Sequence, residues 1–122
     1  MVANVTSLTR SGVADFLVQR VTAVVLTLYA LCVGGFFLVT EPVSHRALVA
    51  YFSSTPMLLF STLAVLSTAA HAWIGMWTVG TDYIRDHYFG RHSTAFRFVY
   101  QSGCVIILFV YVAWALRLFW SL

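Results

Sequence analysis

Three long runs without a charged residue limit what this 122-residue chain can fold into. Asp, Glu, Lys and Arg are all absent between Arg20 and Glu41, between Arg46 and Asp82, and between Arg97 and Arg117. Each run holds the roughly 20 apolar residues that a helix needs to cross about 30 Å of hydrocarbon. Backbone N–H and C=O groups cannot stay unpaired in lipid, so each spanning segment must be helical. The sequence predicts transmembrane helices at 21–39, 57–79 and 98–120.

The composition supports an all-α membrane protein over a soluble helical bundle. Only 9% of the residues are charged and 61% are hydrophobic, whereas soluble domains keep about a quarter of their residues charged. A soluble bundle would also need a polar face on each helix, and 21–39 has none. We expect a single membrane domain covering residues 1–122.

The arginines indicate an orientation. The N-terminal segment and the connection between the second and third spans hold Arg10, Arg20, Arg85, Arg91 and Arg97, and the opposite side holds Arg46 and Arg117. Arginine-rich connections stay on the cytoplasmic side, so the N-terminus is predicted to be cytoplasmic. These arginines flank apolar runs and do not form a basic stripe, so nucleic acid is not an expected partner, whereas membrane lipid is.

One histidine, His71, lies inside the second predicted span, about three residues or 5 Å from its centre. An ionisable side chain at that depth is costly and needs a partner. Two readings remain open: a ligand or proton-relay residue, or a structural histidine that makes one hydrogen bond. Ser67 and Gly75 share its helix face, which predicts either a slot for a flat cofactor or a small-residue surface for close helix packing.

Two further features lie at the end of this span. Asp82 is eleven residues beyond His71, within about 20° of three whole helical turns and about 16 Å further along. With Tyr83 it can bind and protonate a carbonyl-bearing ligand, or it can simply cap the helix. Arg20 either pairs with a cofactor carboxylate or marks the membrane boundary. The basic, aromatic segment 84–97 suits a short interfacial helix or a docking surface.

The chain resembles the smaller, D-type hydrophobic anchor subunit of bacterial succinate dehydrogenase, the cytochrome b part of succinate:quinone oxidoreductase. The resemblance covers Ser7 to Tyr83 and is carried by Ser7-Leu-Thr-Arg-Ser-Gly12, Asp15-Phe16, Arg20-Val-Thr-Ala23, His71-Ala-Trp-Ile-Gly-Met-Trp77 and Thr81-Asp-Tyr83. The stretch from His71 to Trp77, followed by Thr81-Asp-Tyr83, is its most specific part. From Ile84 onward the resemblance weakens, and the third span matches only in hydrophobicity.

The resemblance implies a role for four residues. His71 would be an axial ligand of a b-type haem, and so its iron ligand, with the second ligand supplied by the C-type hydrophobic subunit that completes the helical bundle. Tyr83 would hydrogen-bond a ubiquinone carbonyl, with Asp82 at the same site. Arg20 would lie near the haem propionates. No catalytic residue is expected in this chain, which would not bind succinate itself.

The resemblance also implies an assembly, respiratory complex II in a bacterial inner membrane. Electrons would arrive from a flavoprotein subunit through an iron–sulfur subunit on the cytoplasmic face, linking the tricarboxylic acid cycle to electron transport. The alternatives are a haem-free scaffold, a fumarate-reductase-type anchor, and a small transporter. A transporter would normally show several ionisable groups within its spans, whereas His71 stands alone well inside these runs.

Overall fold

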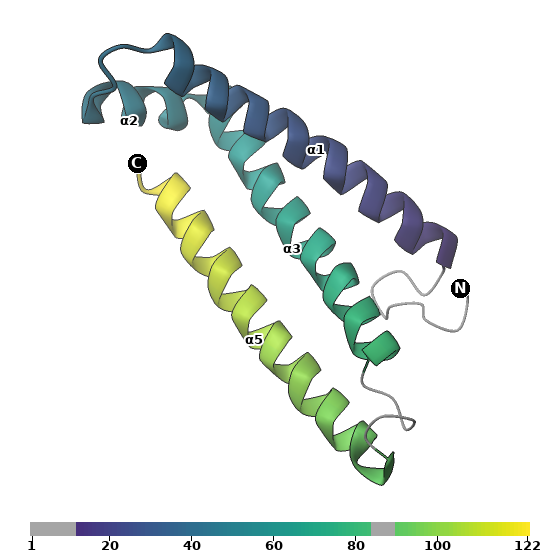
Figure 1. Cartoon of the computed structure of the whole chain (residues 1–122). Coiled ribbons are helices and arrows are strands. Elements are labelled where there is room, and N and C mark those ends of the chain that lie inside the picture. The colour runs from purple at the N-terminus through teal and green to yellow at the C-terminus, as the bar shows by residue number, and fades with distance from the viewer. Residues whose placement is uncertain (1–11, 84–89) are drawn as a thin grey trace.

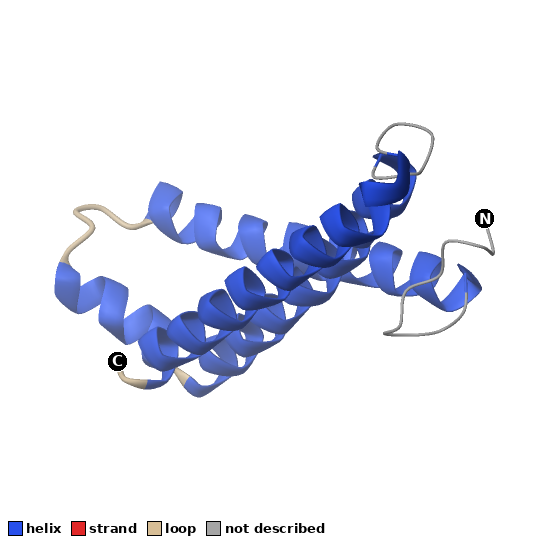
Figure 2. Ribbon diagram, turned by 90° about the horizontal axis from the view of Figure 1, so that it is seen from below, coloured by secondary structure: helices blue, strands red, loops and turns tan. Residues whose placement is uncertain are grey.

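The computed structural model describes residues 12–83 and 90–122, and within these ranges the secondary structure is helical (Figure 2). The elements, in chain order, are α1 (Gly12–Val39), α2 (His45–Ser53), α3 (Thr55–Tyr83), the 3₁₀ turn η2 (Gly90–His92) and α5 (Ser93–Trp120). Figure 1 shows α1, α3 and α5 as long helices, with α2 crossing one end of the bundle.

The three long helices confirm the predicted spans and the all-α membrane class. Each is long and apolar enough to cross a membrane. They contain 28, 29 and 28 residues, or about 42 Å of helix each. This exceeds the about 30 Å of hydrocarbon, so their ends extend into the headgroup layer. Charged residues such as Arg20 and Arg97 end the apolar runs without ending the helices, which explains why the predicted spans are shorter.

Helix α3 is the central helix of the bundle, with α1 on one side and α5 on the other (Figure 1). A third of its most apolar stretch is buried, against 6% for α1 and α5. Ser61 and His71 contact α1, whereas Thr62 and Gly80 contact α5. At about 100° per residue His71 lies about 180° around α3 from both Thr62 and Gly80, and Ser61 lies about 100° from them. The outer surfaces of α1 and α5 are exposed and apolar, as lipid requires.

The short helix α2 is not among the predicted spans, although residues typical of a helix start and a helix end flank it in the sequence. Ser44 caps it by accepting a hydrogen bond from the Ala47 N–H at 3.1 Å, and Ser54 ends it just before Thr55-Pro56. Its aromatic side chains join the ends of the long helices. Tyr51 stacks on Phe36 of α1 at 4.3 Å between ring centroids, and Phe52 lies 5.9 Å from Phe119 of α5.

The start of α1, the end of α3 and the start of α5 lie at one end of the bundle (Figure 1). Arg20, Arg91 and Arg97 belong to this end, and Arg46 and Arg117 to the other. The described arginines are therefore divided as the three-span prediction requires. Arg10 and Arg85 lie outside the described residues. Which end faces the cytoplasm stays a prediction.

Candidate functional site

His71 lies on the side of α3 that packs against α1, and its ring is half-buried. Its Nδ1 is 3.0 Å from Oγ1 of Thr22, a residue of α1 that is only 7% exposed. The intramembrane histidine thus has a polar partner, as its position in the bilayer requires. Within the described residues, the other ring nitrogen, Nε2, makes no hydrogen bond.

Thr22 is itself tied to its own helix. Its hydroxyl is 2.7 Å from the carbonyl oxygen of Val18 and 3.1 Å from that of Gln19. Back-bonding of this kind satisfies a threonine hydroxyl within an apolar helix and sets its side-chain rotamer. The contact between α1 and α3 at His71 is therefore a short polar chain from backbone carbonyl to hydroxyl to imidazole.

The small-residue face around His71 packs against α1. Ser67 is buried, and a Cβ placed on Gly75 would lie 4.0 Å from Nε2 of Gln19. That distance is an ordinary van der Waals contact, so the glycine allows close approach without being sterically required. Of the two readings left open by the sequence, this face supports helix packing. A flat cofactor on His71 would have to approach outside the contact with α1.

A second polar contact between α1 and α3 is absent from the sequence-based predictions. Tyr29 Oη lies 2.7 Å from Oγ of Ser61, which is fully buried. Small and polar residues at 61, 64, 71 and 75 share this side of α3 at helical spacing. That spacing is the signal from which the contact side could have been identified, although it does not name Tyr29 as the partner.

Two buried polar atoms in the described residues lack a hydrogen-bond partner: Oε1 of Gln19 on α1 and Nε1 of Trp77 on α3. Gln19 lies one turn from Thr22 and contacts the Gly75 position. Trp77 packs with Trp73, their ring centroids 5.7 Å apart. An unpaired buried donor or acceptor costs about 1–3 kcal/mol. Both atoms lie in the same part of the bundle as His71. A polar group from outside this chain would satisfy them.

Arg20 lies apart from His71. It is exposed, and its guanidinium carbon is 5.0 Å from the centroid of the Phe16 ring. It precedes Thr22 by two residues, so it leaves α1 on nearly the opposite side from the contact with α3. There it lines a shallow hollow of about 310 Å³ with Ala23, Val24, Thr27 and Leu28. The fold does not bring Arg20 and His71 together within this chain.

The backbone of α3 continues through Tyr83. The helix is therefore unbroken from His71 to Asp82, as the prediction that they share a helix face requires, and the two residues are about 16 Å apart along it. The side chains of Asp82 and Tyr83 lie outside the described residues, so their predicted roles stay predictions. Of the 84–97 segment, residues 90–92 form η2, whereas 93–97 belong to the long helix α5.

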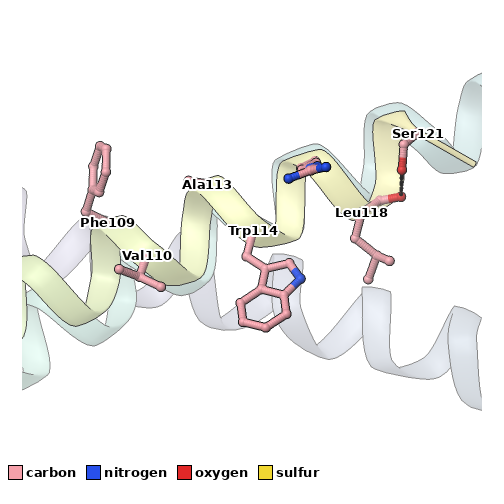
Figure 3. Close-up of a pocket in the computed structure, with 7 residues that line it drawn as sticks. Phe109, Val110, Ala113, Trp114, Leu118 and Ser121 are labelled. Carbon is pink, nitrogen blue, oxygen red and sulfur yellow. Dashed lines mark hydrogen bonds between the residues drawn. The ribbon is translucent and has the colours of Figure 1, made fainter.

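Two other hollows have a different character. One of about 340 Å³ lies between α3 and α5 and is lined by Ala69, Ala70, Trp73, Val105 and Leu108. The other, of about 530 Å³, runs along α5 (Figure 3) and is lined by Phe109, Val110, Ala113, Trp114, Arg117, Leu118 and Ser121. In Figure 3 Ser121 donates its hydroxyl to the Leu118 carbonyl. Neither hollow is lined by a His, Cys, Asp or Glu side chain, so neither offers a second metal ligand beside His71.

Among the described residues no three His, Cys, Asp or Glu side chains group to hold a metal ion. A haem makes a smaller demand on the protein, because its iron needs only axial side-chain ligands. A single imidazole with one nitrogen lacking a hydrogen bond meets that demand for one of the two axial positions. The surroundings of His71 are therefore compatible with its serving as one axial ligand of a haem.

Comparison with known proteins gives a relative that covers most of the chain. No family model matches the chain. A protein of Coxiella burnetii (strain RSA 493 / Nine Mile phase I) named succinate dehydrogenase hydrophobic membrane anchor subunit is 35% identical to it over 111 residues. The alignment covers 91% of this chain and 90% of the relative, so the similarity extends over all three spans.

Proposed function

Because the chain belongs to the family of succinate dehydrogenase hydrophobic membrane anchor subunits, we propose that His71 supplies one axial ligand to a b-type haem in that enzyme. The chain is a multi-pass membrane subunit of an enzyme complex. It carries no proposed catalytic residue. Its own chemical contribution is to hold a redox group and part of a quinone site within the bilayer.

The observation that carries this proposal is the environment of His71. Its Nδ1 is held by the buried Thr22 at 3.0 Å, whereas its Nε2 has no partner among the described residues. Histidine ligands of metals typically hydrogen-bond through one ring nitrogen and coordinate through the other. When bound, the haem supplies one-electron redox chemistry. This chain contributes one ligand, and the C-type hydrophobic subunit contributes the second.

The proposed quinone site lies at the end of α3, where Tyr83 donates a hydrogen bond to a ubiquinone carbonyl and Asp82 delivers a proton. Support comes from the continuous helix that places Asp82 in the register of His71, about 16 Å further along. A salt bridge between Arg20 and a haem propionate requires the propionate to extend around α1, because Arg20 leaves α1 on the side away from Thr22.

The proposed assembly is respiratory complex II in a bacterial inner membrane. The end of the bundle that holds Arg20, Arg91 and Arg97 faces the cytoplasm, where the iron–sulfur and flavoprotein subunits bind. The charge distribution supports this orientation, because arginine-rich connections remain cytoplasmic. The chain thereby connects succinate oxidation in the tricarboxylic acid cycle to ubiquinone reduction.

Replacement of His71 tests the ligand role and has the largest expected effect. We expect the purified complex with His71→Ala to lose the wild-type haem spectrum, recorded as dithionite-reduced minus oxidised absorbance, because an alanine supplies no ligand atom. His45→Ala, in the exposed first turn of α2, is the matched control and leaves the spectrum unchanged. A replacement ligand would still alter the midpoint potential. An assembled His71→Ala complex with unchanged spectrum and potential therefore contradicts the proposal.

A haem-free scaffold is the second candidate function. The hydrogen bond between Thr22 and His71 favours it as well, because a purely structural histidine needs such a partner. The wild-type spectrum separates the two functions. Haem absorbance in the purified wild-type complex supports ligation, and its absence supports the scaffold.

A further inference from the structure

We propose that Thr22 is a positioning residue that sets the tautomer and ring orientation of His71, so that Nε2 is the atom presented to the haem iron. This inference rests on the proposed haem function and deepens it. It assigns to α1 a part in the haem site that depends on neither Arg20 nor the end of α3.

The direction of the hydrogen bonds follows from their geometry. A threonine hydroxyl has one hydrogen to donate and two lone pairs to accept with. The carbonyl oxygens of Val18 and Gln19 can only accept, and Val18 at 2.7 Å is closer to the hydroxyl than Nδ1 at 3.0 Å, so we assign the hydroxyl hydrogen to the bond with Val18. The oxygen of Thr22 then acts as an acceptor toward His71. In this arrangement Nδ1 carries the hydrogen, which leaves the lone pair of a neutral ring on Nε2.

Burial makes this arrangement selective. Thr22 is 7% exposed and lies in the part of α1 that packs on α3, so water does not readily replace it as the acceptor. In the other tautomer the Thr22 hydroxyl would have to turn its hydrogen from the Val18 carbonyl to Nδ1, which gives up the shorter of the two hydrogen bonds. The two helices thus hold the imidazole in one orientation. The ring already has the orientation that coordination requires when the haem binds.

The same chain of hydrogen bonds affects the electronic character of the ligand. A hydroxyl that donates to a carbonyl is a better acceptor, because linked hydrogen bonds polarise one another. A stronger Nδ1–H bond raises the basicity of Nε2, and a more basic ligand favours ferric over ferrous iron. Loss of the Thr22 hydroxyl should therefore raise the haem midpoint potential and lower haem affinity, the latter by about 10- to 100-fold.

The test compares substitutions that separate hydrogen bonding from packing. Thr22→Val keeps the branched shape but removes the acceptor, whereas Thr22→Ser keeps the acceptor but removes a methyl group. Thr27→Val is the matched control, because Thr27 on the same helix donates to the Ala23 carbonyl at 2.8 Å and has no side-chain partner among the described residues. The readouts on the purified complex are the haem midpoint potential, the g-values of the ferric haem and the rate of haem loss.

Positioning predicts a raised potential, altered g-values and faster haem loss in Thr22→Val, with wild-type values in Thr22→Ser and Thr27→Val. Wild-type potential and g-values in Thr22→Val would overturn the inference. If Thr22→Val does not assemble, Thr22→Ala is compared with Thr22→Ser: a shift in the alanine variant alone supports positioning, and equal values overturn it. Failure of the haem function itself is distinguishable, because the wild-type complex then shows no haem absorbance.

Discussion

The two sides of α3 are held to their neighbours in different ways. Toward α1, the buried Thr22 and Ser61 make directional polar contacts with the half-buried His71 and Tyr29, respectively. Toward α5, the contacts are largely apolar: Trp73 lines a hollow with Val105 and Leu108, and the backbone of Gly80 lies close to the ring of Tyr100. One hydrogen bond across this side, from Trp120 Nε1 to Thr62 at 2.8 Å, is at the opposite end from Tyr83.

This difference indicates a division of roles within one helix. Apolar surface gains little from association in lipid, so α5 depends on close packing against α3. Polar contacts define one orientation, and α1 has them where His71 needs to be fixed. Substitutions on the α1 side should change the haem, as proposed for His71 and Thr22. Substitutions on the α5 side should change helix association and leave the haem potential intact.

The largest effect expected on the α5 side comes from Gly80→Leu. A Cβ on Gly80 would lie 3.1 Å from Cε1 of Tyr100, so a longer side chain must displace that ring. We expect a loss of stability of about 1–3 kcal/mol, measured by thermal unfolding of the purified complex, and faster alkylation of the buried Cys104 on α5. Gly103→Leu is the control, because a Cβ there meets nothing within 4 Å. A shifted haem potential in Gly80→Leu would break the proposed division between the two sides.

A smaller effect is expected for Tyr29→Phe, which removes the hydroxyl bonded to Ser61. Hydrogen bonds between membrane helices contribute about 0.6 kcal/mol on average and about 1.7 at most. Ser61 can turn to its own helix backbone, which limits the loss. Thermal unfolding measures the change against Tyr111→Phe, whose hydroxyl is exposed and has no hydrogen-bond partner among the described residues. Equal stability of the two variants would show that this contact does not stabilise the α1 side.

The smallest effect is expected for Trp120→Phe. This change removes the hydrogen bond to Thr62 and keeps an aromatic ring at the membrane boundary. Trp120 is 55% exposed, so water can replace much of the contact, and we expect a loss of at most about 0.6 kcal/mol. Trp114→Phe, at a 71% exposed position, is the control in the same unfolding measurement. A loss as large as that of Gly80→Leu would show that α5 also depends on a polar contact.

The sequence by itself determined the spans and the depth of the histidine. Charge-free runs bounded by Arg20, Arg97 and Arg117 locate the membrane segments, because a charge is expensive in hydrocarbon and no folding detail changes that cost. Helical spacing places His71 on one face with Ser67 and Gly75, and the structure places both His71 and the Gly75 position against α1. The helices extend beyond the predicted spans, since a helix continues into the headgroup layer where charges are tolerated.

Only the tertiary structure decided which helix each side of α3 meets and which threonine meets His71. In lipid an apolar side chain is equally acceptable against a helix or against the membrane, so the apolar pattern of α1 and α5 does not distinguish inside from outside. Thr22, Thr27, Thr68 and Thr78 all bond to their own helix backbone and look alike in sequence. Packing of α1 on α3 brings Thr22 to the imidazole, and that contact determines which ring nitrogen of His71 remains available.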